Sequence, residues 1–475
     1  MSKEFYQNPL CERYSGDRMK RIFSPDNRYY IWRRLWLSLA EGERRLGLNI
    51  TQDQIDEMKA NLKNIDYQKV AEYESSTRHD VMAHILAFGD VCPKAKPIIH
   101  LGATSCFVGD NGDIIMYREG LKQVKNRLIG VLSALKDFAL RHKELKTLAY
   151  THFQAAQPTT VGKRATLWAQ DLLLDLERLD SLISSLKLLG CKGTTGTCAS
   201  FLQLLKTTDR VEALEDYIAK DMGFEGTYAV SGQTYSRKID YFILSVLSGI
   251  AQSASKFAND VRLLSHLKEV DEPFEKGQVG SSAMAYKRNP MRSERICSLA
   301  RLVICNGENP AITAATQWFE RTLDDSANRR ISIPESFLAI DGILNLYGNV
   351  ISGMTVYPYV IDKHLKEELP FMATENILMY CVERGGDRQA LHERIRELSV
   401  ESAKSIKLCG KANDLLERIL SDSTFNLTKK ELDDIVNVDN FVGLAPKQTE
   451  DFCQNILAPA IEGAGDGQED FTVNV

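Results

Sequence analysis

The chain has 475 residues, of which 44% are hydrophobic and 26% charged, a balance typical of globular proteins. This length exceeds one ordinary hydrophobic core, so we expect about two to four structural units. The net charge of −5 argues against a nucleic-acid-binding or membrane-surface protein, and an anionic ligand therefore requires a local group of basic residues.

The ten cysteines are scattered and form no C-x-x-C pair. This usage favours reduced thiols in a cytoplasmic protein over a zinc site or a disulfide framework, and we expect no metal and no cofactor. The first residues contain no apolar segment of the secretory kind, and no window approaches 18 uninterrupted apolar residues. We therefore expect neither secretion nor a membrane partner.

Long helices are the dominant prediction along the chain, because apolar residues recur at spacings of three and four. The period predicts one helix from about 236 to 268, which exceeds an ordinary globular helix. Helices of this length with several apolar faces need partners, and we expect these to come from other copies of the chain. The four stripes are 117–138, 172–186, 239–264 and 337–354.

Segments rich in Gly, Pro and small polar residues interrupt this pattern, and long loops between rigid helices are where functional residues concentrate. We expect loops there, with a helix starting near Ser293, and a frayed tail at the end of the chain. The expected loops are 98–113, 147–162, 190–200 and 271–292, and the expected tail is 463–475.

These elements predict an all-α fold of three helical domains, in which a central long-helix bundle assembles into a tetrameric helical core. The expected domains are an N-terminal helical domain at 1–111, the central bundle at 112–357 and a C-terminal helical domain at 358–475.

The 271–292 segment presents a chemically specific order of residues. Gly277 and Gly280 give the backbone freedom, Ser281 adds a hydroxyl, and Lys287 and Asn289 add a cation and an amide. Composition alone also allows a solvated linker. A hydroxyl followed by a lysine and an amide can, however, abstract a proton and stabilise the anion that forms.

This segment resembles the loop of the fumarase/aspartase superfamily, which reads G-S-S-x-M-P-x-K-x-N-P. The match fails at one fixed position, where Ala285 replaces proline; this removes a φ constraint but no chemical group. Two further regions of that superfamily are present in the family's order, at 102–105 with 110–111 and at 151–154 with 157–160. The resemblance covers nearly the whole chain.

Within the superfamily, the chain resembles the adenylosuccinate lyases in the segments 9–14, 78–80, 232–238, 292–295 and 319–330. The resemblance implies β-elimination of fumarate from adenylosuccinate, giving AMP. It also implies the same elimination from succinyl-aminoimidazole-carboxamide ribotide (SAICAR), giving AICAR, both in purine nucleotide biosynthesis.

The resemblance also implies the roles of individual residues. Ser281 is the base, His152 the general acid, and Glu294 the carboxylate that pairs with this histidine. Lys287 and Asn289 bind the carboxylate on which charge grows, and His79 lies near the phosphate or the leaving group. Substrate contacts fall on Arg13, Tyr14, Arg78, Asp80, Thr104, Ser105, Gln233, Arg295, Arg321, Ser326 and Arg330, while Arg237, Lys238 and Arg329 have no assigned role.

The family forms homotetramers whose sites each take residues from three subunits, which implies a homotetramer here with a small-molecule nucleotide as substrate. The alternatives are another fumarate-releasing lyase, such as an argininosuccinate lyase, and a non-catalytic structural homologue like the lens crystallins. A nucleic-acid-binding scaffold lacks support, because no basic stripe is present.

Overall fold

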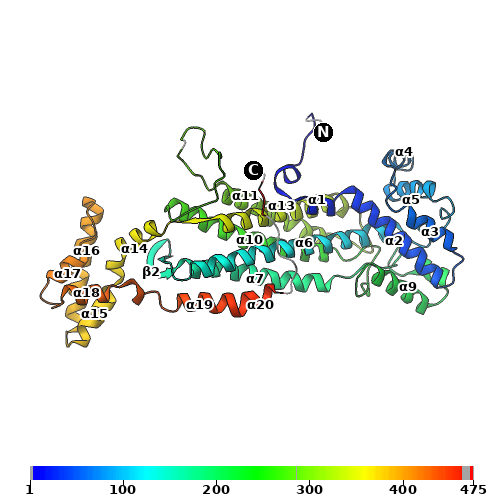
Figure 1. Cartoon of the computed structure of the whole chain (residues 1–475). Coiled ribbons are helices and arrows are strands. Elements are labelled where there is room, and N and C mark those ends of the chain that lie inside the picture. Colours follow the sequence, from blue (N-terminus) through cyan, green and yellow to red (C-terminus); the bar gives the residue numbers. More distant parts are fainter. Residues whose placement is uncertain (1–3, 285, 463–470, 474–475) are drawn as a thin grey trace.

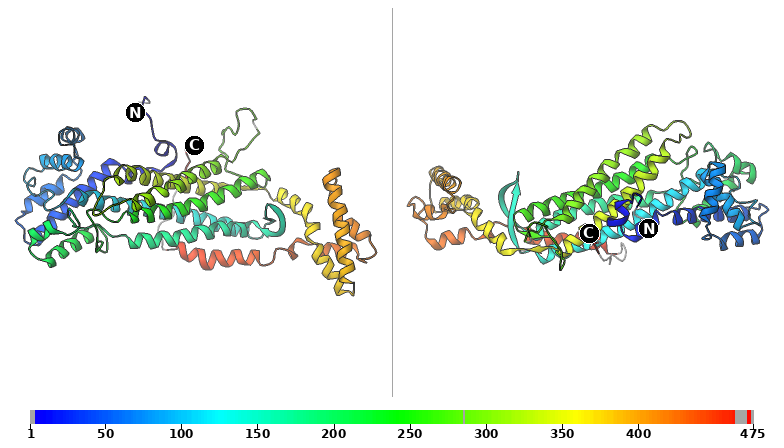
Figure 2. Two further views of the ribbon diagram at one scale, coloured as in Figure 1. Left: turned by 180° about the vertical axis from the view of Figure 1, so that it is seen from behind. Right: turned by 90° about the horizontal axis from the view of Figure 1, so that it is seen from above.

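The protein is an elongated bundle of long helices with a smaller helical group at each end (Figure 1). The computed structural model describes residues 4–284, 286–462 and 471–473. The same arrangement is visible from behind and from above (Figure 2). The bundle consists of α6 (Ser105–Arg141), α7 (Val161–Ser185), α10 (Lys238–His266), α11 (Met291–Asn306), the short α12 (Glu308–Ala315) and α13 (Asp325–Gly353).

The predicted apolar stripes form the core of this bundle. The stripes of 117–138 and 337–354 are buried throughout, in α6 and α13. Those in α7 and α10 are also buried, except that Ile183, Ile239 and Val246 are only partly covered. The long helix expected over 236–268 is α10, within two residues at each end, and the all-α prediction is confirmed.

Residues 10–91 form the N-terminal part of the structure, and its helices from residue 52 onward make up the group at one end of the bundle (Figure 1). The N-terminal part packs on α6 and α13 through η1, α1 and α2. Two later helices, α8 (Ala199–Leu205) and α9 (Thr208–Asp221), join it there, because α9 packs on α2. Its elements are η1 (Leu10–Tyr14), α1 (Asp17–Ile22), α2 (Pro25–Arg45), α3 (Gln52–Ala60), α4 (Tyr67–Thr77) and α5 (Asp80–Val91).

The group at the other end has its own cluster of buried apolar residues, between Ala373 and Ile435. The chain then returns to the bundle, where α19 packs on α7 and α20 packs on α6. The helices from residue 358 onward, in the end group and on the return to the bundle, are α14 (Pro358–Met372), α15 (Thr374–Glu383), α16 (Arg388–Cys409), α17 (Leu415–Ser421), α18 (Lys429–Ile435), η2 (Val438–Asn440), α19 (Ala445–Phe452), η3 (Cys453–Leu457) and α20 (Ala458–Ile461). The three domain boundaries stay predictions.

Two of the expected loops contain regular structure. The 147–162 segment lies in an antiparallel hairpin of β1 (Lys146–Thr151) and β2 (Gln154–Thr160), with His152 and Phe153 at its tip. The 98–113 segment ends as a loop at Thr104, because α6 already begins at Ser105. A helix can use the small residues there for close packing: Gly112, for example, lies against the indole of Trp32.

Of the frayed tail expected over 463–475, residues 463–470 and 474–475 lie outside the described residues, and the described residues 471–473 differ from the expectation. Residues 471–473 lie on α13, where Phe471 and Val473 are partly buried against the core. The other short strands, β3 (Val270–Asp271) and β4 (Thr355–Val356), pair where the chain leaves α10 and enters α14. No helix in the described part of the chain is long and apolar enough to cross a membrane.

Candidate active site

A pocket of about 540 Å³ lies where α5, the start of α6, the 233–237 segment and the start of α13 meet. This volume suits a small-molecule ligand. Of the predicted site residues, eight line it: Arg78, His79, Asp80, Ser105, Gln233, Arg321, Ser326 and Arg330.

Cationic side chains dominate the open part of this pocket. Arg330 forms an exposed ion pair of 3.1 Å with Asp80. Arg78 and Arg321 form no ion pair with any carboxylate of the described chain. Arg321 contacts the Sγ of Cys106, whose pKa burial raises to about 12, so the thiol is neutral. The pocket can therefore bind phosphate or carboxylate groups, for which guanidinium groups are suited.

His79 is positioned as the N-cap of α5. Its Nδ1 accepts a hydrogen bond from the backbone N–H of Met82 at 3.3 Å. An imidazole that accepts at Nδ1 carries its proton on Nε2 when neutral. His79 can therefore offer an N–H group to a ligand in the pocket.

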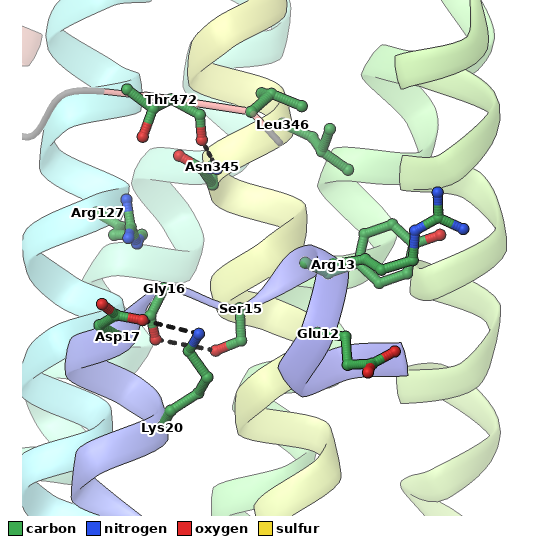
Figure 3. Close-up of a pocket in the computed structure, with 12 residues that line it drawn as sticks. Glu12, Arg13, Ser15, Gly16, Asp17, Lys20, Arg127, Asn345, Leu346 and Thr472 are labelled. Atoms are coloured by element: carbon green, nitrogen blue, oxygen red, sulfur yellow. Dashed lines mark hydrogen bonds and ion pairs between the residues drawn. The ribbon is translucent and has the colours of Figure 1, made fainter. Parts of the chain in front are cut away.

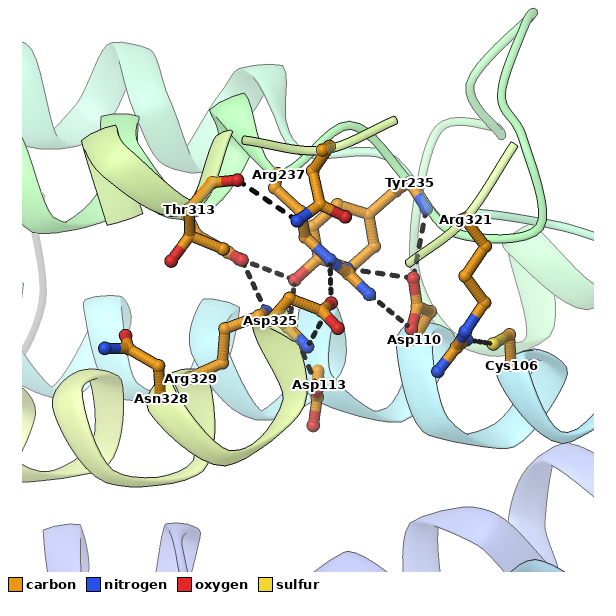
Figure 4. Close-up of polar contacts among 12 residues, drawn as sticks. Cys106, Asp110, Asp113, Tyr235, Arg237, Thr313, Arg321, Asp325, Asn328 and Arg329 are labelled. Atoms are coloured by element: carbon orange, nitrogen blue, oxygen red, sulfur yellow. Dashed lines mark hydrogen bonds and ion pairs between the residues drawn. The ribbon is translucent and has the colours of Figure 1, made fainter. Parts of the chain in front are cut away.

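A buried network of charged side chains forms the floor of this pocket (Figure 4). Arg237 binds both carboxylate oxygens of Asp110, at 3.0 and 3.2 Å, and donates to Asp325 at 2.6 Å. Arg329 donates to Asp240 at 2.6 Å and to the hydroxyl of Tyr235 at 2.5 Å. These residues are all nearly inaccessible to solvent.

The network ties together three segments that carry predicted site residues. Asp110 lies one turn after Ser105 on α6, Tyr235 and Arg237 follow Gln233, and Asp325 and Arg329 flank Ser326 and Arg330 on α13. The backbone N–H of Tyr235 also donates to Asp110, at 3.0 Å. Burial raises the pKa of Asp110, while the guanidinium groups of Arg237 and Arg329 act in the opposite direction and offset part of this effect.

Sequence analysis missed this network. It left Arg237 and Arg329 without a role, and it gave none to Asp240 or Tyr235. A signal was present, because Asp240 lies on the same helical face as Ile243 and Leu247, all of which are buried. Charged residues in register with an apolar stripe indicate a buried ion-pair network.

The 272–290 loop projects from the bundle beside α11 (Figures 1 and 2). Within it, the Oγ of Ser281 accepts hydrogen bonds from the backbone N–H groups of Ala283 and Met284, at 3.3 and 3.2 Å. Such donors favour the charged form of a hydroxyl. The Nζ of Lys287 has no hydrogen bond to Ser281 in the described chain, and Ala285 lies outside the described residues.

Within this loop, Gly280 lies close to the 287–289 segment. Asn289 donates from its side chain to the carbonyl of Gly280 at 3.1 Å. A Cβ at Gly280 would collide with the carbonyl oxygen of Lys287, so this close approach requires glycine. At the base, the carboxylate of Glu272 accepts from the backbone N–H groups of Arg292 and Ser293, at 2.9 and 2.6 Å, and caps α11.

The remaining predicted residues lie elsewhere in the chain. Glu294 and Arg295 are in the first turn of α11, and Thr104 is the N-cap residue of α6. His152 lies at the tip of the β1–β2 hairpin with a positive φ of 52°. The hairpin and α5 lie toward opposite ends of the bundle (Figure 1), so His152 and His79 are far apart within one chain.

Arg13 and Tyr14 line a second pocket, of about 270 Å³, between η1, α6 and α13 (Figure 3). Below it, Asp341 accepts hydrogen bonds from the backbone N–H of Gly16 at 2.6 Å and from Arg127 at 2.6 Å, which fixes this turn on the bundle. Within the described chain, Glu294 forms no hydrogen bond or ion pair with His152. One chain thus holds the predicted residues in several separate groups.

A family model identifies the class of the protein, and solved structures show its fold. A lyase family model matches residues 37–305. The fold is that of a 3-carboxy-cis,cis-muconate lactonizing enzyme from Pseudomonas putida, with a TM-score of 0.80 and 20% identity, covering 97% of this chain and 99% of that one. A fumarate lyase from Mesorhizobium sp. BNC1 is similar, with a TM-score of 0.78 and 20% identity over 97% and 100% of the two chains. The protein is thus an all-α lyase.

Sequence relatives narrow this class. A model of the adenylosuccinate lyase C-terminus matches residues 370–452. The chain is 50% identical to the adenylosuccinate lyase of Saccharomyces cerevisiae, covering 96% of both chains. It is 49% identical to that of Schizosaccharomyces pombe, covering 96% of this chain and 95% of the other. The chain belongs to the adenylosuccinate lyase family.

Proposed function

We propose that the protein cleaves adenylosuccinate to AMP and fumarate, and SAICAR to AICAR and fumarate. Membership of the adenylosuccinate lyase family supports this reaction. The observation that carries it is the pocket of about 540 Å³, in which Arg78 and Arg321 have no carboxylate partner in the described chain. A nucleotide substrate supplies the phosphate and carboxylates that such arginines bind.

The elimination removes a proton from a carbon next to a carboxylate and breaks the adjacent C–N bond. The electron pair of the C–H bond forms the double bond of fumarate, and the leaving nitrogen takes a proton. We assign the first step to Ser281, whose Oγ accepts two backbone N–H groups. Asn289 and Lys287 bind the carboxylate on which charge accumulates.

Protonation of the leaving nitrogen is assigned to His152, with Glu294 holding its imidazolium. His79 lies beside Arg330 and Asp80 in the arginine-lined pocket, where its Nε2–H can contact the phosphate or the leaving base. Thr104 and Ser105 at the start of α6 take the succinyl carboxylate, since helix N-termini bind anions. Arg13, Tyr14, Gln233, Arg295, Arg321 and Ser326 complete the contacts to the substrate.

These assignments require more than one chain. His152 and His79 lie toward opposite ends of the bundle, and the Ser281 loop projects between them (Figure 1). The bundle helices also carry exposed large apolar residues, which mark contact surfaces. A homotetramer with shared sites accounts for both features. The exposed apolar residues of the bundle helices are Leu167, Leu174, Tyr241, Phe242, Leu263, Leu302, Ile304 and Ile331.

The compartment that we propose is the cytoplasm. The ten cysteines, all free, are the feature that supports a reducing environment.

We expect the purified protein to change the ultraviolet absorbance of adenylosuccinate while releasing fumarate, with a kcat/KM above about 10⁴ M⁻¹s⁻¹. Argininosuccinate is the matched control, because it contains the same succinyl group but no phosphate. We expect its kcat/KM to be lower by at least about a thousandfold, since the arginine-lined pocket would stay unfilled. Turnover of argininosuccinate without turnover of adenylosuccinate would assign the protein to the other lyase.

A further inference from the structure

The last described residues, 471–473, form a short extended segment along α13. The side chain of Asn345 donates to the carbonyl of Thr472 at 2.6 Å, and that of Asn349 donates to the carbonyl of Phe471 at 2.9 Å. The ring of Phe471 rests directly on Gly348, where a Cβ would collide with it. Asn345 and Asn349, four residues apart on one face of α13, and Gly348 between them thus form a specific binding site for this segment.

Asn349 connects this binding site to the base of the Ser281 loop, where the loop enters α11. While its Nδ2 binds Phe471, its Oδ1 accepts a hydrogen bond from Arg292 at 2.7 Å. Arg292 also forms an ion pair of 3.1 Å with Glu275, which lies within the loop. The side chain of Arg292 is 4% exposed and that of Glu275 is 68% exposed, so the contact with Asn349 is the stronger of the two constraints on the guanidinium.

The same segment borders the pocket that contains Arg13 and Tyr14. Thr472 and Val473 form part of its wall, and Figure 3 shows Thr472 against Asn345 at the edge of that pocket. Residues 471–473 therefore lie between two groups of predicted site residues, the η1 turn and the loop.

We propose that residues 471–473 are a positioning element, which fixes Arg292 through Asn349 and thereby sets the height and direction of the Ser281 loop. This inference rests on the role proposed for the loop. Because Arg292 is held on one side by Asn349 and on the other by Glu275, loss of the segment frees the loop where it enters α11 without removing any group that contacts substrate. A misplacement of about 1 Å can cost a hundredfold in rate.

The test uses Phe471→Ala in the full-length protein, with two readouts. We expect kcat to fall by about tenfold while KM changes by less than about threefold, since the base is misplaced and the arginine-lined pocket is intact. Tryptic cleavage after Lys276, Lys287 and Arg288, followed by mass spectrometry, should become several times faster. The second readout needs no substrate, so it stays valid even if the proposed reaction is wrong.

Phe452→Ala is the matched control, because Phe452 is also a partly buried aromatic residue packed on the core, but it lies in α19, a helix that packs on α6 and α7. Gly348→Ala should reproduce the Phe471→Ala effect, because its methyl group evicts the ring. The double variant should then be no worse than Gly348→Ala, as expected for two changes at one contact.

Equal loop cleavage and equal kcat in Phe471→Ala and wild type would refute the proposal. So would equal losses of kcat in Phe471→Ala and Phe452→Ala without faster cleavage of the loop, because that pattern reports general destabilisation.

Discussion

Replacing Ser281 by alanine is expected to lower kcat for adenylosuccinate by at least about a thousandfold, the range observed when a proton-transfer group is removed. The carbon acid is weak, and no other hydroxyl in the described loop accepts two backbone N–H groups as Ser281 does, from Ala283 and Met284. Substrate affinity should stay within about threefold, because the arginine-lined pocket is unchanged. Steady-state kinetics and calorimetric binding measure the two quantities.

Ser282→Ala is the matched control for this variant. Ser282 is the neighbouring residue, is exposed, and accepts no hydrogen bond within the described chain. Its replacement should change kcat by less than about tenfold. If Ser281→Ala keeps wild-type turnover, or if Ser282→Ala is the inactive variant, the assignment of the base to Ser281 is wrong.

Two adjacent arginines on α13 are expected to give opposite phenotypes when each is replaced by methionine. Arg329→Met removes the buried partner of Asp240, whose side chain is 1% exposed, so an uncompensated charge remains in the core. We expect a loss of about 3–5 kcal/mol in the free energy of unfolding, as for other broken buried pairs. Thermal unfolding at one fixed protein concentration measures this loss.

Arg330→Met removes a side chain that is 59% exposed and that, among the described residues, forms an ion pair only with Asp80. Such pairs contribute about 0–1 kcal/mol, so the stability should hardly change. KM should rise by at least about tenfold, because one charge-assisted contact to the phosphate is lost. A stable Arg329→Met protein, or an unstable Arg330→Met protein, would contradict the separation between the buried network and the substrate-binding surface.

Much of the fold could be predicted from sequence, because the apolar spacing of long helices records which face is buried. The stripes in α6 and α13 are buried throughout, and α10 begins and ends within two residues of its expected bounds. Where the apolar spacing contained no clear period, the prediction of secondary structure was wrong. The hairpin around His152 has too short a strand pattern, and the early start of α6 lies among small residues that favour no single structure.

The end of the chain shows a different limit of sequence analysis. The composition of 463–475 indicated a frayed tail, yet among its described residues, 471–473, Phe471 rests on Gly348 and Thr472 is bound by Asn345. These contacts are made with residues of α13 that lie more than 100 positions earlier in the chain. The composition of the tail alone cannot predict them.

The candidate site was predicted piece by piece, through resemblance, and the structure adds how the pieces are distributed. Residues near 78–80, 233, 321 and 330 meet in one pocket. The Ser281 loop and the His152 hairpin stay apart from it in a single chain (Figure 1). The buried network beneath the pocket was missed because a charged residue in a sequence is normally expected at the surface.

The central claim is that each site is completed by residues of different chains, and mixing two inactive variants tests it most directly. Ser281→Ala and His152→Ala should each be inactive alone. After dissociation and reassembly as hybrids, activity should recover to about a quarter of the wild-type value, because each position is then filled by an intact chain half of the time. Hybrids that form but stay as inactive as the two parents would contradict shared sites.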